Sequence, residues 1–444
     1  MMRVRSESDK FIVELDKRSV KSRILDRNGI VLAEDCLTDD SVLVRTYPMG
    51  AYMTHTVGYR FVTGTRYNPG LISTGLERIF SQHITGIKDA SSWRGGYKPR
   101  GKDLHLTLDA RLQRKAFESM GGRKGAVVAM NPKTGEVIVL VSSPSYDPNM
   151  IYRDDGSTYK RAEESGAFLN RAISGSYPPG STFKTVLAIA AIQEGYSGFI
   201  SRSVAGGFKG EGMHSRIREH QGKVFGEIGL KHAFKVSSNQ YFAALGLELG
   251  DKLIGKYASE LGFMKTIPWN SKQTIWNIRP SQYPFKPDYP LNPDQLASSS
   301  IGQYGVSATP LQMCMVASAI GNNGVLMKPR IEADRPNRTW RRVMSNETSR
   351  RMRIIMHSVV GENPDDREGT GFNCMIEGLD VGGKTGTAEV PASESHAWFI
   401  ALAPIAEPTL AISVLVENGG YGGTVAAPIA RELFREAMRL GYFD

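Results

Sequence analysis

The chain has 444 residues, of which 41% are hydrophobic and 23% are charged, and its formal net charge is +10. This composition is that of a globular protein with about two or three domains. Its basic residues are scattered and no nucleic-acid-binding motif accompanies them. We therefore exclude nucleic acid as a partner and expect the charge to favour anionic lipid headgroups or an anionic lipid-linked substrate.

The cysteine and histidine content gives no sign of a metal centre. The 3 cysteines are far apart, and the 8 histidines form no HExxH pattern. We predict neither a metal nor a cofactor. The longest apolar runs, residues 137–141 and 185–192, are much shorter than the roughly 20 residues that a membrane span needs. We therefore expect no membrane anchor within this chain.

The N-terminal region is polar and rich in strand-forming residues. Asn28-Gly29 stands between two apolar runs, a pattern typical of a β-hairpin. Farther on, a Gly-rich basic loop at residues 95–102 marks a boundary. We predict a β-rich domain over residues 1–102 and a second domain over residues 103–444.

The boundary loop contains an incomplete nucleotide-binding motif. Residues 96–102 match the opening of a P-loop, but Asp103 stands where the motif needs a Ser or Thr for magnesium. No apolar strand precedes the loop either. We predict no nucleotide site here.

A helix that begins near Ser181 carries the first candidate for catalysis. Any preceding helix or strand is expected to end at Pro178, Pro179 and Gly180. The apolar run at residues 185–192 predicts a core helix. Residues at i and i+3 share a helix face, so the amine of Lys184 can reach the Ser181 hydroxyl. A serine with an amine base beside it is a working nucleophile.

Further elements follow from periodicity and turn residues. Thr309 is expected to cap a helix whose first residue is Pro310, where a missing N–H group is harmless. Strands are predicted at residues 125–130, 136–142, 396–403 and 410–416, and helices at about 229–239, 241–249, 310–321, 341–359 and 427–440.

Two short motifs have duplicates, and their surroundings distinguish them. Ser157-x-x-Lys160 has the same spacing as Ser181-x-x-Lys184 but lies in a polar segment with no apolar helix behind it. Lys133-Thr134-Gly135 is a turn between two strands. We therefore take Ser181-x-x-Lys184, followed along the chain by Ser237-x-Asn239 and Lys384-Thr385-Gly386, as the motifs that matter.

These motifs in this order are the signature of the penicillin-binding proteins and serine β-lactamases. Three stretches are similar to class B penicillin-binding proteins, the monofunctional peptidoglycan transpeptidases: PPGSTFK at 178–184, ATPLQ at 308–312 and KTGTAE at 384–389. DRNG at 26–29, followed by LA at 32–33, resembles the pedestal domain of that family, although Lys21 and Ser22 replace the usual Arg-Gly. The resemblance implies an α+β multidomain fold, with a central antiparallel sheet flanked by helices and a β-rich N-terminal pedestal domain.

The resemblance also implies roles for individual residues. The catalytic residues would be Ser181, Lys184, Ser237, Asn239 and Lys384, and the substrate-binding residues Thr385, Gly386 and Thr387. Ser181 would attack the penultimate D-Ala carbonyl of a stem pentapeptide ending in D-Ala-D-Ala, with Lys184 as base. The backbone N–H groups of Ser181 and Thr387 would form the oxyanion hole.

The expected activity is a peptidoglycan D,D-transpeptidase that β-lactams inhibit covalently. Class A β-lactamases hydrolyse the acyl-enzyme with a Glu-x-x-Leu-Asn loop, and the nearest match, Asp288-Tyr289-Pro290-Leu291-Asn292, has a shorter carboxylate and a proline. We therefore expect slow deacylation. The alternatives are a D,D-carboxypeptidase and a non-catalytic β-lactam sensor or scaffold.

Partners and location follow from the same resemblance. It implies a membrane-anchored enzyme at the outer face of the cytoplasmic membrane, with the anchor absent from this chain. A membrane glycan polymerase within a cell-wall synthesis complex would be its partner.

Overall fold

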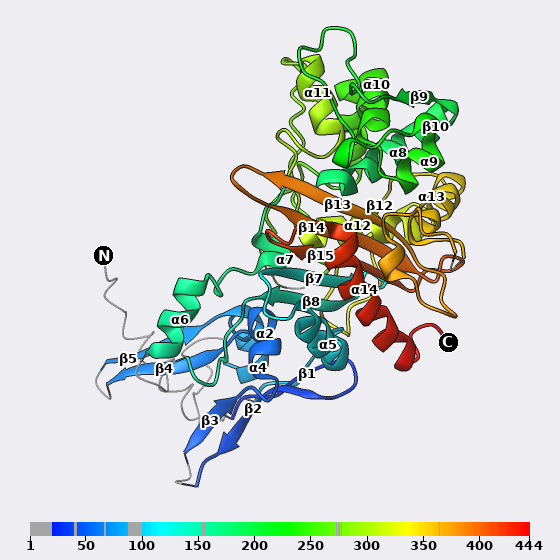
Figure 1. Cartoon of the computed structure of the whole chain (residues 1–444). Coiled ribbons are helices and arrows are strands. Elements are labelled where there is room, and N and C mark those ends of the chain that lie inside the picture. The colour runs from blue at the N-terminus through cyan, green and yellow to red at the C-terminus, as the bar shows by residue number, and fades with distance from the viewer. Residues whose placement is uncertain are drawn as a thin grey trace.

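The computed structural model describes residues 20–39, 42–65, 68–87, 100–151, 156–271, 273, 276, 278–363 and 365–444. Figure 1 shows a β-rich N-terminal part at one end, a sheet in the middle and a group of helices at the other end. Residues 95–99 of the predicted boundary loop, which include the first part of the incomplete P-loop, lie outside the described residues.

The N-terminal part begins with the predicted hairpin. Its sheet has the order β3-β2-β1-β6, with β1 at Ile24–Leu25, β2 at Val31–Leu37, β3 at Leu43–Thr46 and β6 at Leu104–His105. The Asp26 carboxylate closes the turn by accepting from the backbone N–H groups of Asn28 at 2.7 Å and Ile30 at 2.8 Å. Gly29 takes the left-handed conformation, with φ of 82°. Because β6 pairs in parallel with β1, a strand beyond the predicted boundary joins this sheet.

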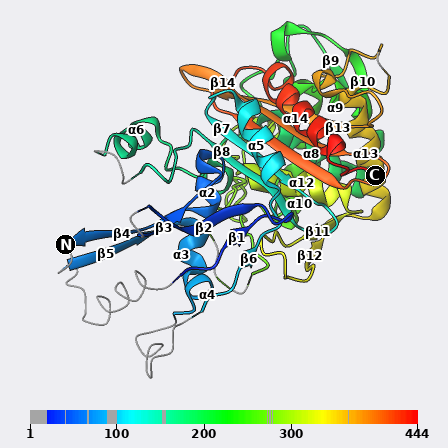
Figure 2. The same ribbon diagram turned by 90° about the horizontal axis from the view of Figure 1, so that it is seen from below.

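A second hairpin and short helices complete the N-terminal part. They are β4 at Arg60–Thr65, β5 at Asn68–Ser73, η1 at Gly50–Tyr52, α2 at Thr54–Val57, α3 at Gly75–Ile79 and α4 at Ser81–Thr85. Figure 2 shows β4 and β5 projecting away from the rest of the molecule. α2 connects the two parts, because the Thr54 hydroxyl donates to the Tyr146 carbonyl at 2.7 Å and the His55 ring lies 2.6 Å from the Ala167 carbonyl.

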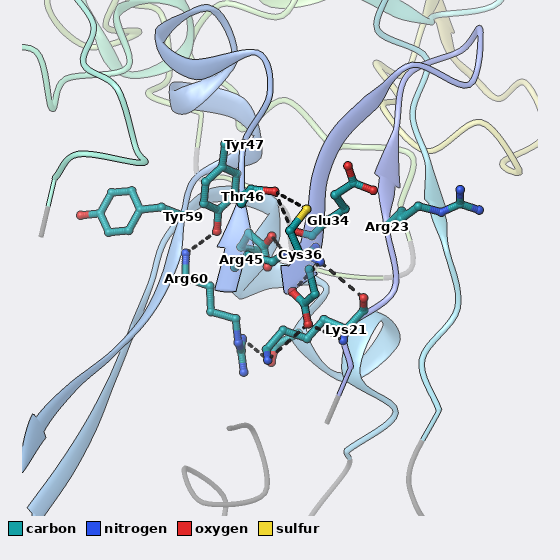
Figure 3. A network of polar contacts seen from close by, with 12 residues as sticks. Lys21, Arg23, Glu34, Cys36, Arg45, Thr46, Tyr47, Tyr59 and Arg60 are labelled. Atoms are coloured by element: carbon teal, nitrogen blue, oxygen red, sulfur yellow. Dashed lines mark hydrogen bonds and ion pairs between the residues drawn. The ribbon is translucent and has the colours of Figure 1, made fainter. Parts of the chain in front are cut away.

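A buried ionic cluster joins β2, β3 and α3. Arg45 donates to Glu77 at 2.7 Å and to Asp35 at 3.2 Å, and these side chains are at most 4% exposed. Burial lowers the pKa of the Arg45 guanidinium, but the two carboxylates raise it by more. Figure 3 shows Arg45 at the centre of this network, close to Tyr47, whose hydroxyl accepts from the backbone N–H of Arg60 at 2.7 Å.

The main sheet is antiparallel throughout, and the four strands predicted at residues 125–130, 136–142, 396–403 and 410–416 take part in it. Its order is β13-β14-β15-β7-β8, with β7 at Gly125–Met130, β8 at Val137–Ser143, β13 at Gly382–Val390, β14 at Ser393–Ala403 and β15 at Leu410–Val416. All residues of β7 and β8 are buried, as their continuous apolar runs predict. β13, which contains Lys384-Thr385-Gly386, forms one edge.

Helices cover both faces of this sheet, and β7 shows the alternation directly. Val127 and Ala129 pack in the core beneath α5 (Ala110–Met120) and α14 (Gly422–Arg439). Ala126, Val128 and Met130 face the opposite core, which contains α8 (Lys184–Gln193) and α12 (Pro310–Gly321). Each face of a strand receives every second residue, so one buried strand serves two cores.

The remaining helices and strands lie mainly on the side of α8 and α12. They are α6 at Ser157–Ser165, α7 at Arg171–Ser174, η3 at Gly180–Phe183, α8 at Lys184–Gln193, η4 at Tyr196–Gly198, β9 at Ile200–Ser203, η5 at His220–Gly222, β10 at Gly226–Gly229, α9 at Leu230–Lys235, α10 at Asn239–Glu260, α11 at Pro293–Ser300, α12 at Pro310–Gly321, β11 at Val325–Met327, β12 at Thr339–Arg342, α13 at Asn346–Val360 and η6 at Phe372–Cys374. Within the described ranges, no helix combines the length and apolarity that crossing a membrane demands.

Two helix predictions differ in outcome. The start of α12 is confirmed, since the Thr309 hydroxyl accepts from the backbone N–H of Gln312 at 3.1 Å and Pro310 is the first helical residue. The predicted helix at 341–359 begins too early. Arg341 and Arg342 belong to β12, and Ser345 caps α13 by accepting from the Thr348 N–H.

Removing one charge from the buried cluster should destabilise the N-terminal part. We expect Glu77→Gln to lower its free energy of unfolding by about 3–5 kcal/mol, because Arg45 would be left buried without its closest carboxylate. Urea unfolding followed by circular dichroism measures this. The control Glu407→Gln breaks an exposed pair with Lys133 and should cost less than about 1 kcal/mol. Equal effects of the two substitutions would contradict the prediction.

Candidate active site

Ser181 lies on a single turn that leads directly into a buried helix. Gly180–Phe183 form a 3-10 turn, η3, and α8 begins at Lys184. Ser181 is partly exposed, whereas every residue from Lys184 to Ile192 is buried. The predicted core helix is therefore confirmed. It holds the Lys184 amine inside the protein, whereas the Ser181 hydroxyl next to it is partly exposed.

Close backbone contact holds this turn against the edge strand β13. Gly180 has φ of 52°, and a Cβ atom on it would lie 2.7 Å from the carbonyl oxygen of Thr387. A Cβ atom on Gly386 would lie 2.8 Å from the carbonyl oxygen of Pro179. Only glycine lets two chain segments approach this closely. The buried Trp398 of β14 adds an anchor, because its indole N–H donates to the Pro178 carbonyl at 3.0 Å.

The Lys184 amine contacts the Ser237-x-Asn239 motif. Its Nζ donates to the Ser237 carbonyl at 2.8 Å and to the Asn239 side-chain oxygen at 2.7 Å, and it lies 3.4 Å from the Ser237 hydroxyl. In the described part of the chain, no hydrogen bond joins the Lys184 amine to the Ser181 hydroxyl. The reason is that these closer oxygens already engage the amine.

Lys384 reaches the same hydroxyl from the opposite side. Its Nζ donates to Ser237 Oγ at 2.8 Å and to the Thr385 carbonyl at 2.9 Å. Both lysines are fully buried. Their amines also lie over aromatic rings, Lys184 at 5.6 Å from the Phe242 centroid and Lys384 at 5.4 Å from the Phe234 centroid. A single serine hydroxyl thus lies between two buried amines.

Burial strongly disfavours charge on this pair of amines. It lowers the pKa of Lys184 to about 7, although the nearby Glu219 carboxylate opposes the shift. It also holds the pKa of Lys384 well below its usual range, and the charge on Lys184 lowers it further. Two amines that share a hydroxyl in a water-poor site cannot both stay charged without a large free-energy cost.

An unusual helix end positions the Ser237 hydroxyl. Ser237 follows the end of α9 with φ of 60°, in the left-handed region, and its N–H donates to the Phe234 carbonyl at 3.2 Å. The N–H of Ser238 donates to the Ala233 carbonyl at 2.8 Å, which completes a Schellman cap. Ser238 then caps α10 by accepting from the N–H of Tyr241 at 3.1 Å. The motif therefore covers the end of the short connection between the two helices and the first residue of α10.

The substrate-binding residues predicted on β13 lie along the open edge of the sheet. The Thr385 hydroxyl donates to the Thr370 hydroxyl at 2.7 Å. Thr385 and Thr387 line one cleft together with Ser181, Ser237 and Asn239. Lys184 and Lys384 lie behind this cleft, in contact with Ser237. The structure thus brings the predicted site residues together.

Several residues that line the cleft belong to none of the sequence motifs and were not predicted. Glu219, His220, Thr370 and Tyr421 line it, and the rings of His220 and Tyr421 stack at a centroid distance of 5.6 Å. The only sequence signal was weak: Tyr421 stands between two pairs of glycines just before α14. Their place in the cleft comes from tertiary folding.

The duplicated motifs lie elsewhere. The Lys160 side chain on α6 is 76% exposed, whereas Lys184 is fully buried. Lys133 lies in the turn between β7 and β8 and pairs with Glu407. Asp288 is exposed, and Asn292 caps α11 by accepting from Gln295. None of these residues lines the cleft at Ser181.

Comparison with known proteins identifies the family. The profile described as "Penicillin binding protein transpeptidase domain" matches residues 125–435. This stretch contains the whole main sheet and every residue of the cleft. The chain therefore belongs to the family of penicillin-binding protein transpeptidases.

Similar proteins match over nearly the full chain. "Peptidoglycan D,D-transpeptidase PbpA" of Mycolicibacterium smegmatis is 32% identical, over 97% of this chain and 91% of its own. The penicillin G acyl-enzyme complex of penicillin-binding protein A from M. tuberculosis is 28% identical, with a TM-score of 0.79 over 95% of this chain and 100% of that chain. The D,D-transpeptidase domain of a peptidoglycan glycosyltransferase from Eggerthella lenta is 26% identical, with a TM-score of 0.79 over 95% and 99%.

Proposed function

We propose that this protein is a peptidoglycan D,D-transpeptidase that cross-links stem peptides through an acyl-enzyme on Ser181 and is inhibited covalently by β-lactams. One observation carries the proposal: the Ser237 hydroxyl contacts two buried lysine amines in a cleft that also contains Ser181 and the edge of β13. The relatives named D,D-transpeptidases support it.

The bonding of Lys184 suits it to act as the base. A neutral amine has two N–H donors and one lone pair, and the short contacts to Ser237 and Asn239 occupy both donors. The lone pair is then free to take the proton of Ser181 as Oγ attacks the penultimate D-Ala carbonyl. Its pKa of about 7 keeps a large fraction of the amine neutral at physiological pH.

The acyl-enzyme forms when the Ser181 Oγ–carbon bond is made and the peptide bond to the terminal D-Ala breaks. The departing amine needs a proton, and the Ser237 hydroxyl, in contact with Lys184 and Lys384, can relay one. A β-lactam reacts in the same way at its ring amide. Because its leaving amine stays attached to the acyl group, the drug remains bound to Ser181.

The edge position of β13 suits an extended peptide ligand. A stem peptide can add to the free edge as a further strand, with main-chain hydrogen bonds. Its terminal carboxylate would meet Thr385 and Thr387, next to the amine of Lys384. The close contact of η3 with β13 supports an oxyanion hole formed by the N–H groups of Ser181 and Thr387.

The setting of the protein is part of the proposal. Residues 1–102 would form the pedestal domain and residues 103–444 the transpeptidase domain. The peptidoglycan substrate class supports an active site at the outer face of the cytoplasmic membrane, beside a membrane glycan polymerase that would make the strands to be cross-linked.

Substitution of the nucleophile tests the acyl-enzyme. We expect Ser181→Ala to abolish labelling by a fluorescent penicillin, because no hydroxyl remains to be acylated. The control Ser157→Ala removes the serine of the duplicate motif and should leave labelling unchanged. Labelling is read on denaturing gels and located by peptide mass spectrometry. Label that persists in Ser181→Ala would contradict the assignment.

Acylation should depend on pH in one direction. Below pH 7 Lys184 carries the proton that it must accept, so the second-order rate of acylation should rise with pH through about 7 and then level off. Stopped-flow measurements with a fluorescent penicillin give this profile. Circular dichroism over the same pH range shows whether the fold is unchanged. A rate that is flat or falls through neutral pH would exclude Lys184 as the base.

The fate of the acyl-enzyme separates this function from its alternatives. With a D-Ala-D-Ala pentapeptide and an acceptor amine, we expect mass spectrometry to detect mainly the cross-linked product. Hydrolysis product alone, with acceptor present, would favour a D,D-carboxypeptidase. Penicillin labelling without either product would favour a sensor or scaffold.

A further inference from the structure

One buried carboxylate contacts the catalytic cleft from a segment without any recognised motif. Glu219 precedes η5 and is 6% exposed. Its Oε2 accepts from the backbone N–H of Asn239 at 2.6 Å, and its Oε1 accepts from the Ser238 hydroxyl and from the N–H of Gln240 at 3.3 Å. Among the described residues, all hydrogen-bond partners of this carboxylate therefore belong to the connection between α9 and α10 or to the first turn of α10.

The residue before Glu219 controls the Asn239 side chain. The Asn239 amide nitrogen donates to the Arg218 carbonyl at 3.1 Å. This bond fixes which end of the amide faces inward, so that the Asn239 oxygen accepts from Lys184 at 2.7 Å. Glu219 holds the backbone of Asn239, and Arg218 holds its side chain.

These contacts act on a strained turn. Ser237 is not glycine, yet its φ is 60°, a conformation that costs free energy for residues with a side chain. Such a residue keeps this conformation only where its surroundings enforce it. Hydrogen bonds to a charged acceptor are among the strongest available for that purpose.

We propose that Glu219 is a positioning residue for acylation, which holds the Ser237–Asn239 turn so that its hydroxyl and amide oxygen face the two lysine amines. Glu219 makes no contact with the reacting atoms itself. Its carboxylate oxygens are occupied by the donors of the turn, so it is not placed to activate water. The inference rests on the proposed function, because it concerns the same cleft.

The position of Glu219 also has an electrostatic consequence. The charged groups that face Lys184 are Lys384 on β13 and Glu219, and Glu219 favours the protonated form of Lys184. His220, Lys223, Glu389 and Tyr421 are the further titratable groups that line the cleft. Loss of the Glu219 charge would therefore lower the pKa of Lys184 and move the rise of the acylation rate to lower pH.

The test is the pH profile of acylation by a fluorescent penicillin in Glu219→Gln. Glutamine keeps the size of the side chain but presents an NH₂ donor group in place of one of the two acceptor oxygens that the turn needs. We expect the plateau rate to fall about 10- to 100-fold and the midpoint to move to lower pH. Glu227→Gln, the same substitution at an exposed position on β10, should change neither. His220→Gln checks that the midpoint does not belong to this imidazole.

Glu219→Asp keeps the charge but shortens the side chain, so we expect a reduced plateau rate with the wild-type midpoint. This variant decides the matter if Glu219→Gln does not fold. An unchanged plateau rate in Glu219→Asp, or an unchanged midpoint in a folded Glu219→Gln, overturns the inference. So does a midpoint that follows His220→Gln instead. If the wild type is not acylated at all, the proposed function fails first and the inference falls with it.

Discussion

The organisation of the site depends on one hydroxyl that lies between two buried amines. Ser237 contacts Lys184 from α8 and Lys384 from β13, so it links the helical side of the protein to the edge of the sheet. Burial makes charge on both amines costly, and this cost favours the neutral amine that the proposed mechanism requires near physiological pH. In the proposed mechanism, the two lysines and the hydroxyl between them carry out the proton transfers.

Close backbone contact between η3 and β13 brings these side chains next to a strand edge that can bind a substrate. Gly180 and Gly386 let the turn of Ser181 touch β13, and Trp398 ties that turn to the neighbouring strand. The proposed nucleophile, Ser181, therefore lies beside a strand edge, where an extended peptide could be held along its length. The rest of the sheet gives this edge its rigidity, because β13 is paired along its inner side and helices cover both faces.

The sequence predicts those parts of this site that depend on neighbouring residues in the chain, such as helix caps and apolar runs. Thr309-Pro310 defines a helix start, and the apolar run after Ser181 defines a buried helix, so both are confirmed. The motifs identify the two lysines and Ser237 in the sequence. Their spacing along the chain does not give the distances between these side chains in the folded protein. Glu219 could not be found in this way, because a single acidic residue in a glycine-containing loop carries no periodicity. The helix prediction is wrong at Arg341 for a related reason: charge alone does not distinguish an exposed strand from a helix.

Ser237 also shows where selection for stability and selection for function separate. The position after α9 is left-handed, and glycine or asparagine suits that conformation better than serine. A method that ranks substitutions by folding free energy would favour replacing Ser237, and a screen for heat resistance would do the same. Either approach would improve the helix connection and lose the hydroxyl. Engineering of this protein must therefore exclude this position from stability optimisation, however favourable the substitution appears.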